Sequence, residues 1–388
     1  MDHKVKRTSK KRERHLHLAQ MRTASLASRC LREAFVQGRL TLYLGAGCSV
    51  ANNIPSWDRL VTQLYVNGIV RRLPRFTSVP GLIASVGQWA FARQLLPLEV
   101  AARKLRGYYR DDSDLLAMIK AMLYGLTGYE GRDRLRPAEI RQLLTDNHTL
   151  RAVCRLCRQS VPGKRGVRAV ITYNYDDFLE KSLGRFPYQS VGRATTLKER
   201  TLPIYHVHGF VPAGRKEGSG MDAVVLTEDQ YNRAVQDAYS WQNLVQLHAL
   251  SGSVGLMVGL SLSDRNLRSL LDALRNLPQR VENYALLRRP QPWKLEHADV
   301  DGVVEKMKTR IRDGFEFGYD RTALGEVEKP GTRKKIVAMI RELEKQDLRQ
   351  EEAMLTQLGV RAIWYEDHAE IGRLIERILP SSRPEKTP

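Results

Sequence analysis

The chain has 388 residues, and 63 lysines and arginines against 43 aspartates and glutamates give it a formal net charge of +20. With 42% hydrophobic residues it can bury a full core, which excludes a wholly disordered or fibrous protein. No apolar run approaches the roughly 20 residues that cross a bilayer, and the basic N-terminus lacks the apolar stretch of a secretory signal. Four cysteines do not make a disulfide framework, so we expect a cytoplasmic protein without membrane contact.

The positive charge is concentrated at the N-terminus. Residues 1–40 hold 11 Lys and Arg against 3 Asp and Glu, a local +8, whereas the remaining 348 residues hold 52 against 40, giving +12. We therefore expect residues 1–38 to form a basic arm and a lead-in helix. Such a charge favours an acidic partner, either a nucleic acid or a nucleotide.

Short apolar runs rich in β-branched residues recur along the chain, with helical segments between them. Most are nearly continuous, as in strands that are buried on both faces of a parallel sheet. The alternation predicts an α/β protein with an open, Rossmann-like parallel sheet, helices on both faces and helical insertions. The predicted strands are residues 40–44, 167–172, 202–208, 223–226, 254–259, 284–287 and 361–365.

Two stretches interrupt this alternation. A helical insert is expected at about residues 73–150 within a core of residues 39–288, with helices predicted over 60–69, 81–106 and 114–126. A second insert, residues 289–358, is charged and helical, with Ile336, Met339, Ile340 and Leu343 on one face. Residues 359–388 then supply the last strand and a C-terminal helix of the core.

The first strand runs directly into Gly45-Ala46-Gly47-Cys48-Ser49. Two glycines at the end of a strand let the backbone turn and approach a phosphate, although glycines also end many strands for steric reasons alone. The dinucleotide fingerprint of dehydrogenases requires a third glycine, where this chain has Val50, and an acidic residue that residues 61–72 lack. A hydride-transfer enzyme of that type is therefore not expected.

Polar residues also follow three other predicted strands. Asn174 and Asp176 follow the second, at the edge where ligands of parallel sheets bind, although Asp176 or Asp177 could equally cap the next helix. His206 and His208 share one side of another strand. A hydrogen-bonded core histidine is the simpler interpretation of His206, whereas His208 is an equally good candidate for a general base.

The strand at 254–259 ends in glycine and serine. Ser261 is placed to bind a ribose or a phosphate, and Ser263 is predicted to cap the helix that begins near Asp264. Residues 227–230, Thr-Glu-Asp-Gln, fit a capping box, for which we expect a structural role only.

Taken in order, GAGCS with IPSW, then TYNYD, HVHG and GLS resemble the sirtuin-like fold over roughly residues 40–290. They are most similar to the bacterial sirtuin-like proteins that hydrolyse NAD in antiphage defence. The resemblance implies that Asn174 and His208 are catalytic and that NAD is the substrate. It implies NAD-binding roles for Gly45, Ala46, Gly47, Ser49, Asp176 and Ser261.

The chain also departs from the deacylase sirtuins, which carry paired zinc-binding CxxC motifs after the His-Gly element. No cysteine follows Cys157, and the only CxxC, Cys154 to Cys157, precedes TYNYD, so we expect no zinc. Residues 53–58, NIPSWD, replace the deacylase motif GIPDFR. Both differences favour NAD hydrolysis to nicotinamide and ADP-ribose over protein deacylation.

The resemblance also implies assembly. Short chains of this kind form homo-oligomers and act with a partner such as a HerA-type ATPase, and this chain has no Walker A motif of its own. Nucleic acid would then be contacted through the partner or the basic arm. Two alternatives stay open, an NAD-dependent protein deacylase and a non-catalytic nucleic-acid-binding or scaffold subunit.

Overall fold

The computed structural model describes residues 24–72, 98–125, 127–128, 130–214, 224–275, 281–291, 302, 305 and 331–380. The chain divides into two compact units. The first comprises Met1–Arg288 and Leu358–Pro388, and the second comprises Arg289–Gln357. Of the basic arm and lead-in helix predicted over residues 1–38, residues 1–23 lie outside the described residues, which begin with a helix over 24–36.

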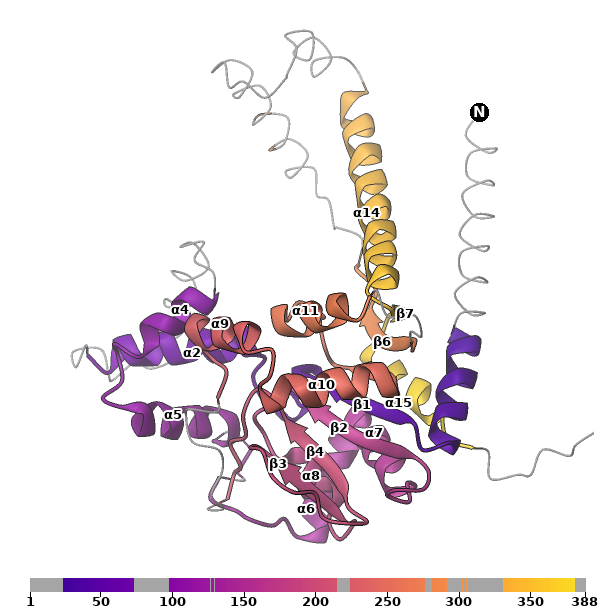
Figure 1. Cartoon of the computed structure of the whole chain (residues 1–388). Helices are drawn as coiled ribbons and strands as arrows, with labels where there is room; N and C mark the ends of the chain where they lie inside the picture. Colours follow the sequence, from indigo (N-terminus) through magenta and orange to yellow (C-terminus); the bar gives the residue numbers. More distant parts are fainter. Residues whose placement is uncertain are drawn as a thin grey trace, which may run out of the picture. The chain divides into compact units, whose positions relative to one another are not determined.

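A single parallel sheet of seven strands forms the centre of the first unit, in the order β3-β4-β2-β1-β5-β6-β7 (Figure 1). The predicted α/β fold with an open parallel sheet is confirmed. All five residues of β1 are buried, because the central strand has helices on both of its faces. The strands are β1 (Leu40–Leu44), β2 (Val167–Thr172), β3 (Tyr188–Val191), β4 (Leu202–His206), β5 (Val254–Val258), β6 (Asn283–Arg288) and β7 (Val360–Tyr365).

Six of these strands coincide with predicted ones, within one or two residues at each end. The strand predicted over 223–226 is wrong for residues 224–226, and Ala223 lies outside the described residues. Val224 and Leu226 are buried, but the segment runs past the end of β4, where Val225 N–H donates to His208 C=O at 2.8 Å. Their hydrophobicity therefore reflects core packing and not strand pairing.

Two groups of helices cover the sheet. In one group, α7 (His148–Arg158) packs against α6 (Pro137–Asp146), α8 (Phe178–Leu183) and α15 (His368–Glu376). In the other, α10 (Trp241–Gly252) packs against β5 and α11 (Arg265–Ala273). Because parallel crossovers are right-handed, connections that leave β1 in opposite directions place their helices on opposite faces.

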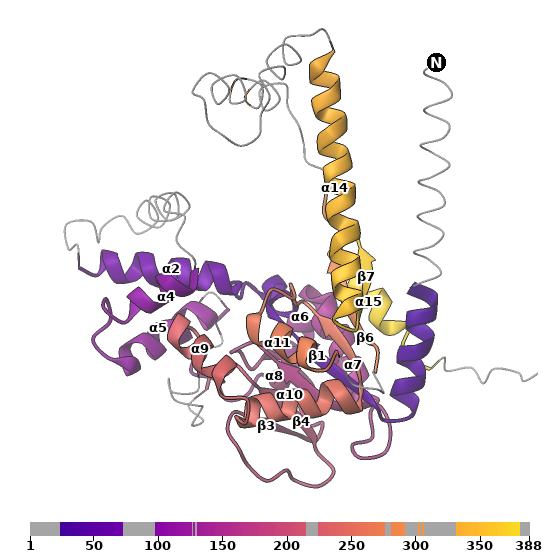
Figure 2. The ribbon, with the colours of Figure 1, turned by 45° about the horizontal axis from the view of Figure 1, so that its top comes forward.

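A helical module follows β1 (Figure 2). It contains α2 (Trp57–Val70), α4 (Leu98–Leu105) and α5 (Asp112–Tyr124), and α4 also contacts α9 (Glu228–Gln236). The helix predicted over 60–69 thus forms, and the helix predicted over 114–126 forms as far as Tyr124, with Gly125 as its C-cap. Leu126 is not described. Of the helix predicted over 81–106, the part from 81 to 97 lies outside the described residues.

The second unit contains α14 (Thr332–Gln357). On the predicted apolar face of this helix, Ile336 is buried, whereas Met339 and Leu343 are about two-thirds exposed (65% and 64%). Across the described part of both units, no helix combines the length and the apolar character that membrane crossing requires.

Strand order places the motifs together. β1 lies between β2 and β5, and β4 follows β2, so the carboxyl ends of these four strands share one edge of the sheet. From β1 the chain continues to β2 on one side and later to β5 on the other. Such a switch point leaves a crevice beyond the strand ends, where open α/β proteins bind ligands.

Candidate functional site

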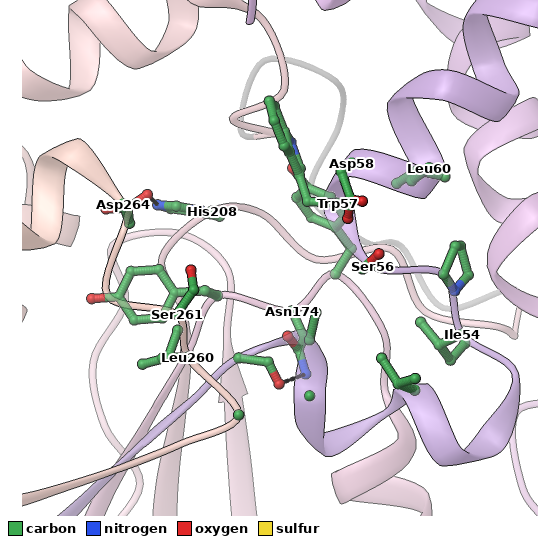
Figure 3. Close-up of a pocket in the computed structure, with 18 of the residues that line it drawn as sticks. Ile54, Ser56, Trp57, Asp58, Leu60, Asn174, His208, Leu260, Ser261 and Asp264 are labelled. Carbon is green, nitrogen blue, oxygen red and sulfur yellow. Dashed lines mark hydrogen bonds and ion pairs between the residues drawn. The ribbon is translucent and has the colours of Figure 1, made fainter. Parts of the chain in front are cut away.

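A cavity of about 650 Å³ opens beyond the carboxyl ends of β1, β2, β4 and β5 (Figure 3). Its volume lies within the roughly 300–1,000 Å³ typical of small-molecule sites. Seven of the eight predicted site residues line it, namely Gly45, Ala46, Gly47, Asn174, Asp176, His208 and Ser261. The eighth, Ser49, is 2% exposed and lies behind Asn174, to which it is hydrogen-bonded.

The glycine loop (residues 45–49) packs directly on the turn that follows β5. A Cβ on Gly47 would lie 2.7 Å from the Cα of Gly259, and a Cβ on Gly45 would lie 2.5 Å from the Gly259 carbonyl oxygen. Gly259 has a φ of 69°. Glycine is therefore required here because two backbones meet, whatever ligand the cavity accepts.

Most N–H groups of the glycine loop already have partners within the chain. Gly45 N–H donates to Val258 C=O at 3.0 Å, and Gly47 N–H donates to Gly259 C=O at 3.0 Å. The N–H groups of Cys48 and Ser49 donate to carbonyls of the loop itself, both at 2.9 Å. A diphosphate at this loop would therefore depend on the Ala46 N–H and on side chains across the cavity.

Asn174 is held firmly at the end of β2. Its side-chain amide donates to Gly45 C=O at 3.0 Å and to the Ser49 hydroxyl at 3.3 Å. Its backbone N–H donates to the Thr172 hydroxyl at 3.1 Å. The end of β2 and the glycine loop are thus joined through one side chain that faces the cavity (Figure 3).

Asp176 combines a structural and an electrostatic feature. Its carboxylate accepts a hydrogen bond from the Phe178 N–H at 3.1 Å, at the start of α8. This contact agrees with the structural interpretation of Asp176, a side chain that caps the next helix. Burial raises the pKa of Asp176 to about 6, and hydrogen bonds from Phe178 and Ser49 offset this only in part. The neighbouring Asp177 instead pairs with Lys181 at 2.7 Å.

His206 is a core histidine. It is 1% exposed, with one ring nitrogen 2.7 Å from the Glu180 carboxylate and the other 3.1 Å from Asn174 C=O. Burial lowers its pKa, but the Glu180 carboxylate, Asn174 C=O and the Asp176 carboxylate together outweigh this effect, so that the pKa of His206 is raised. This environment agrees with the structural interpretation of His206.

His208 is buried in a different way. It is 7% exposed, and its Nε2 forms no hydrogen bond with any residue that the structure describes. The ring lies edge-to-face between Tyr173 and Tyr231, with centroid distances of 4.8 and 5.6 Å. Burial lowers the pKa of His208, and the nearby Asp264 carboxylate opposes this only in part. His208 is therefore a neutral imidazole at neutral pH and can accept a proton.

The turn after β5 carries three polar residues. The Ser261 and Ser263 hydroxyls lie 2.7 Å apart, and both residues are exposed to the cavity. The prediction that Ser263 caps α11 is wrong. Asp264 is the cap, because its carboxylate accepts from Leu267 N–H at 2.7 Å while the Ser263 hydroxyl is bound to Ser261. The capping box at Thr227 is confirmed, with Thr227 N–H donating to Gln230 Oε1 at 2.8 Å.

Three cavity residues have functional potential that the sequence patterns did not reveal. Trp57 and Tyr231 form an edge-to-face pair with centroids 6.2 Å apart, and Tyr231 also contacts His208. Asp264 lies beside His208 (Figure 3). Trp57 belongs to the IPSW segment, but no local signal connects Tyr231 or Asp264 with the strand ends, because each contact joins distant parts of the chain.

The cysteines have no site-like arrangement. Cys30, Cys48, Cys154 and Cys157 are all unpaired thiols. Burial raises the pKa of Cys154 to about 12 and that of Cys157 well above its ordinary value, which agrees with a packing role on α7. Within the described ranges, no group of three or more His, Cys, Asp or Glu side chains is arranged to hold a metal ion.

The fold and the cavity define an α/β protein with an open parallel sheet and a cavity at its topological switch point. Residues 168–311 match the family model of the SIR2-like domain. The matched segment includes β2 to β6 and thus Asn174, Asp176, His208 and Ser261. It supports a sirtuin-like family and an NAD-related function. No curated protein matches the chain.

Proposed function

We propose that this protein is an NAD glycohydrolase, which cleaves the nicotinamide–ribose bond of NAD to give nicotinamide and ADP-ribose. One observation carries the proposal. Within the segment that matches the SIR2-like domain, Asn174 and His208 meet in one cavity, and the buried, neutral His208 has an Nε2 without a hydrogen-bond partner among the described residues. Such a nitrogen is suited to accept a proton from water or from a ribose hydroxyl.

In this mechanism the chain positions the reactants and removes one proton. Cleavage of the glycosidic bond passes through an oxocarbenium-like transition state, as in other glycosyl transfers. Asn174, fixed to the glycine loop, orients the ribose hydroxyls and the attacking water. His208 takes the proton of the water as its oxygen bonds to the ribose carbon, and nicotinamide leaves with the electron pair of the broken bond.

The remainder of the cavity suits the diphosphate and the adenosine. Ser261 and Ser263, in the turn after β5, and Arg265, the first residue of α11, line the same cavity as the glycine loop. We expect these three side chains to contact the phosphates, because most N–H groups of the glycine loop already donate hydrogen bonds within the chain. Trp57 and Tyr231 offer an aromatic wall for an aromatic base.

The proposal is tested by nicotinamide release from NAD with the purified chain, alone and with a HerA-type ATPase. His208→Ala should lower the rate by roughly 10²–10⁴, as loss of a general base does. Asn174→Ala should also lower the rate, because the ribose and the water would lose the group that orients them. His248→Ala, an exposed histidine on α10, serves as the matched control and should release nicotinamide at the wild-type rate. If His208→Ala matches the wild type, the proposal is wrong.

The same assay separates the alternatives. A deacylase would release nicotinamide only with an acyl-lysine peptide, whereas the proposed hydrolase needs none. A nucleic-acid-binding or scaffold subunit would bind in a strongly salt-dependent way and would be indifferent to Asn174 and His208. The volume of the cavity and the aromatic and polar groups that line it favour the enzyme.

We further propose that the activity serves antiphage defence by depleting NAD, and that it is triggered with a partner while the chain forms a homo-oligomer. The net charge of +20, with +8 in residues 1–40, supports this proposal, because a basic chain attracts an acidic partner or nucleic acid held by a partner. Light scattering of the chain with and without the ATPase, and NAD levels in infected cells, test this. A monomer in both conditions, or unchanged NAD during infection, contradicts it.

A further inference from the structure

The Asp264 carboxylate has two separate contacts. Oδ1 accepts the hydrogen bond from Leu267 N–H at 2.7 Å and caps α11. Oδ2 lies 3.4 Å from Nε2 of His208, which is an ion-pair distance without hydrogen-bond geometry. Both side chains are largely buried, at 8% exposure for His208 and 14% for Asp264. The cap thus holds one carboxylate oxygen beside the ring (Figure 3).

We propose that Asp264 is the positioning residue of His208, which orients the imidazole ring and stabilises the imidazolium that forms when His208 takes a proton. This inference rests on the proposed hydrolase function and adds a residue to it. A buried cation is costly in the absence of a nearby negative charge. A carboxylate held by a helix cap supplies that charge beside Nε2 without moving.

The remaining groups around His208 do not provide this charge. Tyr173, at the end of β2, and Tyr231, on α9, both contact the ring with their own rings. Burial raises the pKa of Tyr173 well above its ordinary value, so it is neutral. Asp58, Asp176 and Arg265 line the same cavity. Among the described residues, Asp264 is the carboxylate that the structure places within ion-pair distance of His208.

The proton balance of the step is simple. The attacking water gives its proton to His208 as its oxygen bonds to the ribose carbon, and the resulting imidazolium lies against the Asp264 carboxylate. The proton then passes to solvent after nicotinamide has left, and His208 returns to its neutral form. In this step Asp264 neither gives nor takes a proton and forms no bond to the substrate.

Asp264→Asn separates the charge from the cap, because asparagine caps helices about as well as aspartate. Asp367→Asn is the matched control. Asp367 caps α15 by accepting from Ala369 N–H at 2.9 Å, and it is not part of the cavity lining. Both variants should therefore fold like the wild type, and only the first removes a charge beside His208.

The first readout needs no turnover. In NMR titrations of histidine-labelled protein, with the His208 signal assigned through His208→Gln, Asp264→Asn should lower the His208 pKa below that of the wild type. Asp367→Asn should leave it unchanged. An unchanged His208 pKa in Asp264→Asn overturns the proposal. A rise toward the ordinary value of about 6.5 also overturns it, because solvent entry and not loss of a charge would then dominate.

The second readout is nicotinamide release as a function of pH. Asp264→Asn should shift the acidic limb of the rate profile to lower pH and reduce the plateau rate roughly ten- to a hundredfold, part of the 10²–10⁴ that a general base contributes. A wild-type profile would overturn the role of Asp264 alone. If His208→Ala were also fully active, the proposed function would fail, and the NMR titration would still report on the pairing.

Discussion

Replacing Gly259 by alanine should destabilise the protein by about 2–5 kcal/mol. Gly259 has a φ of 69°, and a Cβ there would lie 2.6 Å from the Cys48 nitrogen and 2.8 Å from the Gly47 carbonyl carbon. The left-handed backbone costs an L-residue about 1–2 kcal/mol. Forcing a methyl group against backbone that cannot rotate away adds about 1–3 kcal/mol.

Gly163 provides the matched control for this substitution. Its φ is 80°, and a Cβ there would meet nothing within 4 Å. Gly163→Ala should therefore cost only the conformational term of about 1–2 kcal/mol. The difference between the two variants isolates the contact between the glycine loop and the turn after β5.

Equilibrium unfolding in urea measures both variants against the wild type. We expect Gly259→Ala to be less stable than Gly163→Ala by about 1–3 kcal/mol. Equal destabilisation would refute the reasoning, because it would show that the two backbones can separate at no cost.

Two further predictions concern buried charges. Lys181→Ala should lower the free energy of unfolding in urea by about 3–5 kcal/mol, because it leaves the Asp177 carboxylate buried without its partner at 2.7 Å. Lys181→Met combined with Asp177→Asn should recover most of this loss. If Lys181→Ala is as stable as the wild type, the prediction is wrong. Because the pKa of Asp176 is raised from 3.8 to about 6, the free energy of unfolding of the wild type should fall as the pH rises through this range. Asp176→Asn should therefore be more stable than the wild type by up to about 3 kcal/mol at neutral pH. Its rate of NAD hydrolysis should fall. If the stability difference between Asp176→Asn and the wild type does not shrink toward acidic pH, the pKa of Asp176 is not raised.

Six of the seven strands could be predicted. β1 and β5 are nearly continuous apolar runs, as strands buried on both faces are. β4 instead alternates buried and half-buried residues, which is also a strand pattern. β3 could not be predicted. Its sequence, YQSV, is half-buried and partly polar, and it is a strand only because β4 provides hydrogen-bond partners along its edge. Residues 224–226 show the opposite case. Val224 and Leu226 are buried, but the segment is not a strand because its backbone does not pair with a neighbouring strand.

The candidate site divides in the same way. Asn174 and His208 were predicted to meet because the carboxyl ends of parallel strands share an edge, and both line the cavity; their chemical roles stay predictions. The helix cap was assigned to Ser263 instead of Asp264, because both residue types cap helices and the local sequence does not decide between them.

The sequence by itself determined which segments have the hydrophobic pattern of a helix or of a strand. It also determined the polar residues at the strand ends and the two glycines of the first turn. These depend on interactions among residues a few positions apart, which leave a pattern. Only the tertiary structure decided that Gly259 meets Gly47, that Asp264 faces His208 and that Tyr231 closes the cavity beside Trp57. Those contacts follow from the order β4-β2-β1-β5, which long-range pairing sets and which no local pattern encodes.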